Sequence, residues 1–377
     1  MRLWATEVLP RDGRAGVLVG RVAMDDGPHV IAARDDGLYD LSALAPTVSD
    51  LLELDAPASA VRAHAGLRLT SLDDALGAGS LLAPCDLSAI KAAGVTFAES
   101  LIERVIEERA KGEPAAAEAL RLELRRRVGG DLEGVRPGSA AAQALKEELV
   151  RQGLWSQYLE VGIGPDAEIF TKAQPMSAVG CGALVGVHSR SEWNNPEPEI
   201  VLACAPNGEA VGAALGNDVN LRDFEGRSAL LLGKAKDNNA SCAIGPFIRL
   251  FDETFSMDDV RRARVRLVVE GKDGFRVEGE NAMSKISRDP TDLAAAAFET
   301  HQYPDGLMLF LGTMYVPSAD RRGRGQGFTH ECGDIVRISA DQLGALVNEV
   351  TDCLSAPPWR FGARALMRSL AARGLLR

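Results

Sequence analysis

The stretch that decides the fold of this chain is Trp193-Asn194-Asn195-Pro196-Glu197-Pro198-Glu199. It leads into an apolar run from Ile200 to Ala205, a turn at Asn207-Gly208 and a second run from Glu209 to Val219. Asn-Gly between two such runs is a strong signal for a two-residue β-hairpin turn. The sequence therefore predicts an antiparallel hairpin whose open end carries two prolines and several carboxylates.

The turn also sets the register of this hairpin. With Asn207-Gly208 as the turn, Glu197 faces Asp218 and Glu199 faces Gly216. Side chains two apart in a strand share a face, as do directly opposed residues of an antiparallel pair, so the three carboxylates are expected to converge. A single β-bulge between Glu199 and Asp218 would move one side to the other face.

Three converging carboxylates repel one another, and a divalent cation removes the conflict. Glu197, Glu199 and Asp218 offer only oxygen donors, which favours Mg²⁺, with Mn²⁺ and Ca²⁺ as alternatives. The two prolines stiffen the segment that presents the glutamates. The competing interpretation is a solvated acidic edge strand that proline and glutamate protect against aggregation.

The composition narrows the class of protein. The 377 residues include 42 Lys+Arg and 53 Asp+Glu, a formal net charge of −11, which argues against a nucleic-acid partner. Hydrophobic residues make up 46% of the chain, which is typical of a globular protein. Without a long apolar run or a secretory leader, we expect a cytoplasmic protein with no membrane partner. The six cysteines are scattered and predict neither disulfides nor a zinc site.

Changes in residue composition and hydrophobic pattern along the chain predict three segments. Residues 1–86 combine short apolar runs with Asp-Asp-Gly turns and predict a small β-rich domain. Residues 87–153 are rich in Ala, Glu, Leu and Arg and predict a helical connector. Residues 154–377 are mainly β in pattern, with hairpin turns at Asn207-Gly208 and Asp273-Gly274, and a closing helix from Phe361 to Leu376.

Basic residues follow the carboxylates along the chain. Arg222 comes four residues after Asp218, and Lys234 and Lys236 follow a short helix-like stretch. A cation with Arg and Lys around it would bind a small anion such as a carboxylate, despite the net negative charge. The alternative for Arg222 is a structural ion pair with Asp223.

These motifs together resemble the fumarylacetoacetate hydrolase superfamily over residues 168–339. The motifs that carry the resemblance are Glu197-Pro198-Glu199, Gly216-Asn217-Asp218-Val219 with Arg222-Asp223, Ala235-Lys236 leading to Gly245-Pro246, and Gly312-Thr313. The resemblance implies an α+β fold, with a mixed β-roll catalytic domain, a smaller β-rich N-terminal domain and a helical connecting segment. It also implies a Mg²⁺ or Mn²⁺ site formed by Glu197, Glu199 and Asp218.

Further segments are similar to a narrower branch, the bacterial 2-keto-3-deoxy-pentonate dehydratases. They are Gly153 to Val161, His301 to Gly306 and Gly327 to His330. By this resemblance Lys236 is a catalytic, substrate-facing lysine, with Lys234 as the alternative in the alignment. Thr313 would contact the substrate carboxylate, and Lys172 would lie near the mouth of the site. The resemblance also implies a homodimer or homotetramer.

A departure from the superfamily concerns its lid motif, Asn-Tyr-x-x-His-x-x-Glu. The matching segment runs from Thr96 to Glu103 and has Ser100 at the histidine position, whereas Glu103 keeps the glutamate. The His-Glu pair that activates water is therefore missing, which disfavours hydrolysis. Glu103, or Glu99 one helical turn before it, is the expected general base.

The resemblance thus implies a metal-dependent dehydratase that acts on a small 2-keto acid. The substrate would be 2-keto-3-deoxy-D-xylonate or D-arabinonate and the product 2,5-dioxopentanoate, with Lys236 and Arg222 neutralising charge and Thr313 orienting the carboxylate. A C–C bond hydrolase or a decarboxylase on the same fold is the first alternative, since fold does not fix the reaction. A metal-dependent sugar-acid-binding protein without catalysis is the second.

Overall fold

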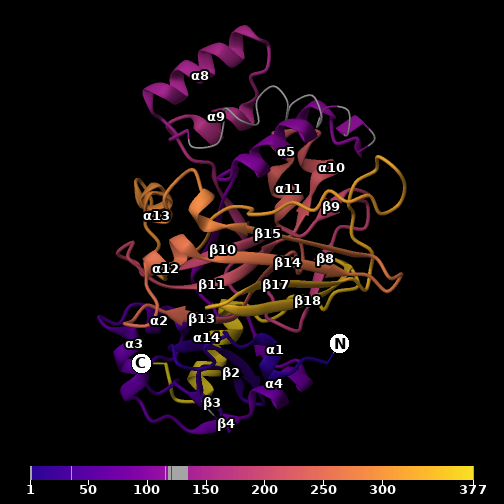
Figure 1. The fold of residues 1–377 in the computed structure, drawn as a ribbon. Coiled ribbons are helices and arrows are strands. Elements are labelled where there is room, and N and C mark those ends of the chain that lie inside the picture. The colour runs from indigo at the N-terminus through magenta and orange to yellow at the C-terminus, as the bar shows by residue number, and fades with distance from the viewer. Residues whose placement is uncertain (1, 35, 115, 118–119, 121–134, 377) are drawn as a thin grey trace.

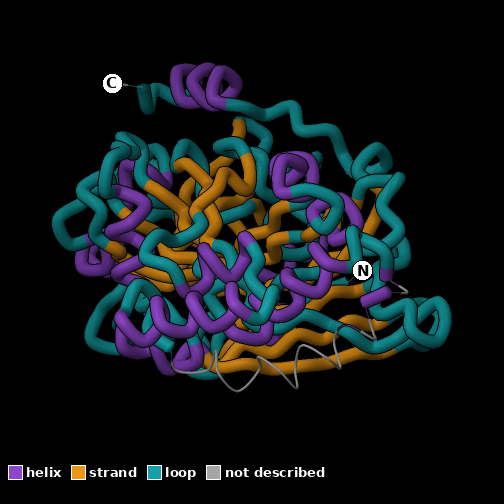
Figure 2. Tube along the Cα trace, turned by 90° about the horizontal axis from the view of Figure 1, so that it is seen from above, coloured by secondary structure: helices purple, strands orange, loops and turns teal. Residues whose placement is uncertain are grey.

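Helices and strands are mixed along the whole described chain (Figure 1). The computed structural model describes residues 2–34, 36–114, 116, 117, 120 and 135–376. Within them the strands form mixed sheets, and the predicted α+β class is confirmed. The helices gather mainly outside the strands when the molecule is viewed from above (Figure 2).

The N-terminal segment contains short strands and helices. Its elements are α1 Ala5–Val8, β1 Leu18–Met24, β2 Gly27–Arg34, β3 Gly37–Asp40, α2 Val48–Leu52, α3 Pro57–Ala63, β4 Arg68–Thr70, α4 Leu72–Ala78 and β5 Leu81–Leu82. β1 and β2 form the expected hairpin, with Met24 opposite Gly27. β1 also pairs with β13 (Cys242–Leu250), so this segment extends a sheet of the remainder of the chain.

The described part of the connector is helical except for one strand near its start. It contains β6 Ala89–Ala93, α5 Ala98–Arg109 and α8 Ala140–Arg151. α9 (Gln157–Ile163) continues the helical section beyond the expected boundary, and α5, α8 and α9 lie together at the top of the view in Figure 1. Apolar residues of α5 and α9 pack in one cluster with Trp193, which seats this helical group beside the Pro-Glu stretch.

The remaining elements contribute most of the sheet structure. They are β7 Ile169–Ala173, β8 Leu184–Val187, β9 Asn194–Asn195, β10 Pro198–Cys204, β11 Ala210–Asp218, β12 Asn220–Leu221, α10 Arg222–Glu225, α11 Leu232–Lys236, β13 Cys242–Leu250, α12 Met257–Arg262, β14 Arg264–Glu270, β15 Arg276–Ala282, α13 Pro290–Phe298, β16 Leu307–Phe310, β17 Ile335–Ala340, β18 Gly344–Asp352 and α14 Ala363–Ala372, with 3₁₀ turns at Ala229–Leu231 and Met283–Lys285. The predicted closing helix is therefore present as α14.

Strand order places β10 and β11 inside the larger sheet. Its path runs β4-β3-β2-β1-β13-β11-β10-β16-β6-β7, with β5 beside β1. A second sheet runs β15-β14-β17-β18-β8, and β9 pairs with β12. The hairpin is therefore no edge strand, which rules out the interpretation of the Pro-Glu stretch as a solvated edge.

The two faces of the hairpin belong to different parts of the core. Ile200 and Leu202 pack in the largest apolar cluster, whereas Val201 and Ala203 pack in a second cluster on the other side of the sheet. This alternation is the period of a strand that is buried on both faces. No helix within the described ranges is long and apolar enough to cross a membrane.

Candidate active site

The hairpin register brings the three carboxylates together as expected. Glu199 pairs with Gly216, and the amide of Asp218 donates to the carbonyl of Glu197 at 3.1 Å. A bulge does occur in the hairpin, but it lies between Ala203 and Cys204, next to the turn. The faces of Glu197, Glu199 and Asp218 are therefore kept.

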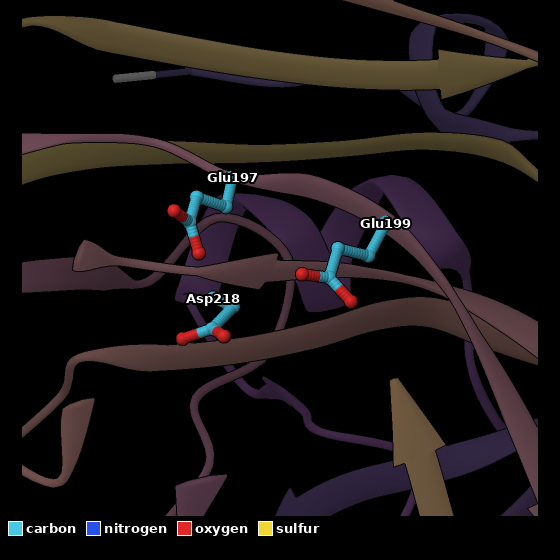
Figure 3. Close-up of side chains that lie close together, drawn as sticks. All are labelled: Glu197, Glu199 and Asp218. Carbon is cyan, nitrogen blue, oxygen red and sulfur yellow. The ribbon is translucent and has the colours of Figure 1, made fainter. Parts of the chain in front are cut away.

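Their carboxylate oxygens could ligate one ion. One oxygen from each of Glu197, Glu199 and Asp218 lies within 4.8 Å of the others, and each residue is 1% exposed. Figure 3 shows the three carboxylate ends grouped around a shared space. The predicted convergence is confirmed, and the ligand role stays a prediction.

Cationic side chains surround this cluster. Lys236 from α11 donates to Glu197 and, at 3.0 Å, to Asp218. Lys172 from β7 lies with its Nζ 2.9 Å from Asp218 Oδ1. Arg104 from α5 donates to Glu197. Three buried carboxylates thus face three buried cations, which lowers the cost of burying charge.

The three carboxylates differ in their electrostatic surroundings. Burial opposes ionisation of Glu197, but Arg104 and Lys236 outweigh it and lower its pKa to about 2. For Glu199, burial together with the charges of Asp218 and Glu197 raises the pKa well above its usual range. Its oxygens accept from the Gly312 amide at 2.7 Å and from the Thr313 hydroxyl at 3.3 Å. Glu199 is therefore a carboxylate whose repulsion from Glu197 and Asp218 a bound cation would relieve.

This donor set fits a hard divalent ion. All candidate ligand atoms are carboxylate oxygens, and Mg²⁺ prefers such ligands over nitrogen or sulfur. The Gly312 backbone has φ +106°, and a Cβ there would lie 1.9 Å from Thr96 Oγ1. Glycine is thus required where the chain turns its amide toward Glu199.

The predicted catalytic and substrate residues lie in two groups. Lys236, Lys172 and Thr313 contact the carboxylate cluster directly. Lys172 is fully buried, donating to the Val219 carbonyl at 3.2 Å, so it lies deep in the site rather than at a mouth. The alignment alternative, Lys234, is exposed.

Arg222 belongs to a second group that joins α10 to α5. Its guanidinium donates to Glu103 at 2.9 Å and to Glu107 at 2.6 Å, and it stacks on Trp193 at 4.3 Å. The alternative for Arg222, an ion pair with Asp223, is not among the contacts of the described residues; Asp223 instead accepts from Ser191 at 2.8 Å.

Sequence reasoning misplaced one face of α5 and missed two of its residues. Of the two candidates for the general base, Glu99 is exposed, whereas Glu103 is 2% exposed. Arg104 and Glu107 are also buried, and Arg104 Nη1 donates to Glu107 at 2.7 Å. A helix that buries charges against other charges gives no apolar period at those positions.

A further carboxyl near the site was also missed. Burial raises the pKa of Glu168, and the charges of Arg104, Lys236, Glu197 and Asp218 act on it. Its carbonyl accepts from the Gly94 amide at 3.0 Å, which extends the β6–β7 pairing. Glu168 lies directly before β7, and the strand period of two, continued by one residue, places it on the face of Phe170.

Comparisons with known proteins agree with this geometry. The sequence profile described as fumarylacetoacetate (FAA) hydrolase C-terminal matches residues 165–351. The chain is 30% identical over 209 residues to a probable 2-keto-3-deoxyxylonate dehydratase of Haloferax volcanii, covering 55% of this chain and 68% of the relative. The chain belongs to the fumarylacetoacetate hydrolase family.

Another member of this family is more similar but less completely covered. It is a 2-dehydro-3-deoxy-D-arabinonate dehydratase of Saccharolobus solfataricus, 35% identical over 186 residues. The match covers 48% of this chain and 58% of that relative, which is less than two thirds of its length.

Solved structures show the family fold. The apo form of a 2-keto-3-deoxy-D-arabinonate dehydratase has a TM-score of 0.57 and 22% identity, covering 89% of this chain and 95% of that chain. A structure of that dehydratase complexed with magnesium and 2,5-dioxopentanoate has a TM-score of 0.57 and 21% identity, with the same coverage. A fumarylacetoacetate hydrolase from Exiguobacterium antarcticum has a TM-score of 0.55 and 16% identity, covering 89% and 99%.

Proposed function

We propose that this chain is a Mg²⁺-dependent dehydratase that converts a 2-keto-3-deoxy-pentonate to 2,5-dioxopentanoate and water. The observation that carries the proposal is the buried cluster of Glu197, Glu199 and Asp218 with Lys172 and Lys236 on its carboxylates. Two relatives at 30% and 35% identity, both named dehydratases of such sugar acids, support the substrate class.

Each residue of the site has its own role in the proposed reaction. Glu197, Glu199 and Asp218 would hold the ion, which when bound supplies Lewis-acid polarisation of the C2 carbonyl. Lys236 neutralises the negative charge that develops as the C3 proton leaves. The hydroxyl of Thr313, which now donates to Glu199, orients the substrate carboxylate.

Two carboxyls compete for the proton at C3. Glu103, the residue expected from the sequence, is held by Arg222 at 2.9 Å, so its carboxylate already has a protein partner. Burial raises the pKa of Glu168, which makes its carboxylate a stronger base than an exposed glutamate. We therefore assign the proton transfer to Glu168 and the positioning of Arg222 to Glu103.

The reaction balances as one loss of water across C3 and C4, followed by two proton shifts within the product. Glu168 takes a proton from C3, the C4 hydroxyl leaves with a proton as water, and a C3–C4 double bond forms. A proton then moves from C5 to C3, and tautomerisation gives the C5 aldehyde. No oxidant or reductant is consumed.

Hydrolysis is disfavoured by the lid segment. Ser100 stands where a histidine would activate water, and its hydroxyl donates to the Phe97 carbonyl at 2.9 Å inside α5. A serine hydroxyl held in this way is no base at neutral pH.

Product analysis tests the proposal. The protein is incubated with Mg²⁺ and 2-keto-3-deoxy-D-pentonate, the single compound that is derived from either D-xylonate or D-arabinonate, and the mixture is analysed for a C5 aldehyde by NMR. We expect 2,5-dioxopentanoate, with activity lost in EDTA. Two shorter products would overturn the proposal in favour of C–C cleavage, and saturable binding without product would show a sugar-acid-binding protein.

Two matched variants test whether Glu168 or Glu103 is the general base. We expect Glu168→Gln to lower kcat by about 10²-fold or more, the usual scale for loss of a general base, without changing Mg²⁺ affinity. Glu103→Gln should raise KM more than it lowers kcat. The reverse pattern would return the base role to Glu103.

A further inference from the structure

A pair of buried asparagines extends the carboxylate face by one residue pair. β9 and β12 place Asn195 opposite Asn220, next in the ladder after Glu197 and Asp218. Val219 and Leu221, the neighbours of Asn220 in the chain, pack in the largest apolar cluster. Since side chains alternate along a strand, Asn195 and Asn220 lie on the face of the metal candidates.

These two amides are buried without the bonds that buried amides normally make. Both residues are 0% exposed. Asn195 Oδ1, Asn220 Oδ1 and Asn220 Nδ2 have no hydrogen-bond partner among the residues that the structure describes. A buried amide left unpaired loses its hydrogen bonds to water without replacing them, so native proteins normally pair such groups.

The neighbouring asparagines Asn194 and Asn217 are engaged in part: Asn217 Oδ1 accepts from the Glu197 amide at 3.1 Å, whereas its Nδ2 has no partner among the described residues. On the opposite face, Asn194 Oδ1 accepts from the His330 amide at 3.2 Å and its Nδ2 donates to the Ser191 carbonyl at 3.3 Å. Asn195 Nδ2 donates to the Pro196 carbonyl at 2.9 Å, which fixes the orientation of its open oxygen. Asn220 differs from these neighbours because both its side-chain oxygen and its side-chain nitrogen lack a partner among the described residues.

We propose that Asn195 and Asn220 form the subsite that recognises the terminal hydroxyl of the substrate. This inference rests on the proposed function and names the part of the substrate that the carboxylate cluster does not bind. A hydroxyl both donates and accepts, and the pair offers the Asn220 Nδ2 donor with two amide oxygen acceptors.

The chemistry of the pair selects the ligand class. Asn195 and Asn220 bring no charge, so they match a neutral hydroxyl; a second carboxylate would face their oxygens, and an alkyl chain would leave them unpaired. Asn220 lies two residues from Asp218, about 6.6 Å along the strand. A five-carbon 2-oxo acid chelated at its keto end spans such a distance. The ligand is thus a hydroxylated 2-oxo acid rather than a dicarboxylate.

Binding of two unreactive ligands tests the subsite. The probes are 5-hydroxy-2-oxopentanoate and 2-oxopentanoate, which lack the C4 hydroxyl that would be lost, measured by calorimetry with Mg²⁺-loaded protein. We expect wild type to prefer the hydroxylated ligand about tenfold, the effect of one well-made hydrogen bond. In Asn220→Leu and in Asn195→Ala we expect this preference to disappear through weaker binding of the hydroxylated ligand alone.

Folding of the variants is controlled separately. Asn220→Leu removes no protein hydrogen bond made by the side chain, so Tm should not fall. The matched control is Asn348→Ala: Asn348 is buried and donates to the carbonyls of Gly180 at 2.9 Å and Ala183 at 3.0 Å, far along the chain from the site. It should lower Tm and keep the ligand preference.

The outcomes distinguish this inference from the proposed function. A wild-type protein without preference, or an Asn220→Leu variant that keeps it, overturns the subsite even if dehydration is observed. Loss of preference in the variant supports the subsite even if no 3-deoxy sugar acid is dehydrated. Failure of both 2-oxo acids to bind overturns both proposals.

Discussion

Replacing Glu199 by glutamine should change the stability of this protein in opposite directions with and without metal. Glu199 is 1% exposed, and its protein contacts at the carboxylate are the Gly312 amide and the Thr313 hydroxyl. Both are neutral donors, whereas Glu197 and Asp218 add negative charge nearby. Glutamine keeps the shape and one acceptor oxygen but removes the charge.

The size of the effect follows from the cluster geometry. The ligand oxygens lie within 4.8 Å of one another, and two unit charges at that distance repel by about 3.5 kcal/mol at an effective dielectric of about 20. Glu199 faces two such charges, and Lys236 offsets part of the repulsion. Because burial and the charges of Asp218 and Glu197 raise the pKa of Glu199 well above its usual range, we expect Glu199→Gln to stabilise the metal-free fold.

Metal should reverse this order. At a Mg²⁺ concentration of about 100 times Kd, wild type gains about 2.7 kcal/mol by mass action, and a variant that has lost a ligand gains far less. The assay is thermal unfolding of both proteins in EDTA and in a Mg²⁺ series, with exposed Glu209→Gln at the turn of the same hairpin as control. A Glu199→Gln variant less stable than wild type in EDTA, or equally stabilised by Mg²⁺, would refute the assigned metal centre.

Three further predictions concern Gly94, Arg222 and Asp40. Gly94→Ala places a Cβ 1.8 Å from Glu168 Oε2, so kcat should fall about tenfold or more while the calorimetric Mg²⁺ affinity is kept; an unchanged kcat would remove Glu168 from the reaction. Arg222→Lys loses the stacking on Trp193 and the fork to α5, and kcat/KM should fall about tenfold; a wild-type value would show that charge alone suffices. Burial opposes ionisation of Asp40, but hydrogen bonds from His29 and Ser42 outweigh it and lower its pKa to about 2, so this group stabilises the fold above pH ~4, and that stabilisation is lost as the pH falls toward ~2. In Asp40→Asn the free energy of unfolding should fall by about 1 kcal/mol less than in wild type as the pH is lowered from ~4 to ~2, after allowance for solvent screening. Identical pH profiles of the two proteins would contradict the pairing of Asp40 with His29.

The hairpin and its carboxylates were predictable because the turn is local. The turn differs from the expected two-residue Asn207-Gly208, because the Gly208 amide donates to the Ala205 carbonyl at 2.9 Å and Cys204 pairs with Ala210. The bulge between Ala203 and Cys204 offsets this shift, so the expected pairing holds from Ala203 to Pro198. A period of two then assigns Glu197, Glu199 and Asp218 to one face.

The inward charges of α5 could not be predicted in the same way. Arg104 and Glu107 gain their burial from partners on other elements, since Arg104 Nη1 lies 3.0 Å from Glu225 and Glu107 accepts from Arg222. Periodicity detects apolar faces, and an ion-paired face looks like a solvated one. The depth of Lys172 was hidden for the same reason, because its partner Asp218 is 46 residues away in sequence and its strand, β7, lies at the far end of the sheet path.

The arginine on Glu197 joins the candidate metal ligands to α5. Arg104 occupies one carboxylate oxygen of Glu197 and Lys236 the other, so a divalent ion that takes either oxygen competes with a protein cation. Such competition is reciprocal. A change that weakens the contact of Arg104 with Glu197 would lower the free energy of ion binding at Glu197 by the same amount. Arg104 also holds Glu107 and Glu225, so it keeps partners when it leaves Glu197. The exchange therefore leaves no buried charge unpaired, which is the condition under which a fully buried ionic cluster can bind and release a metal ion.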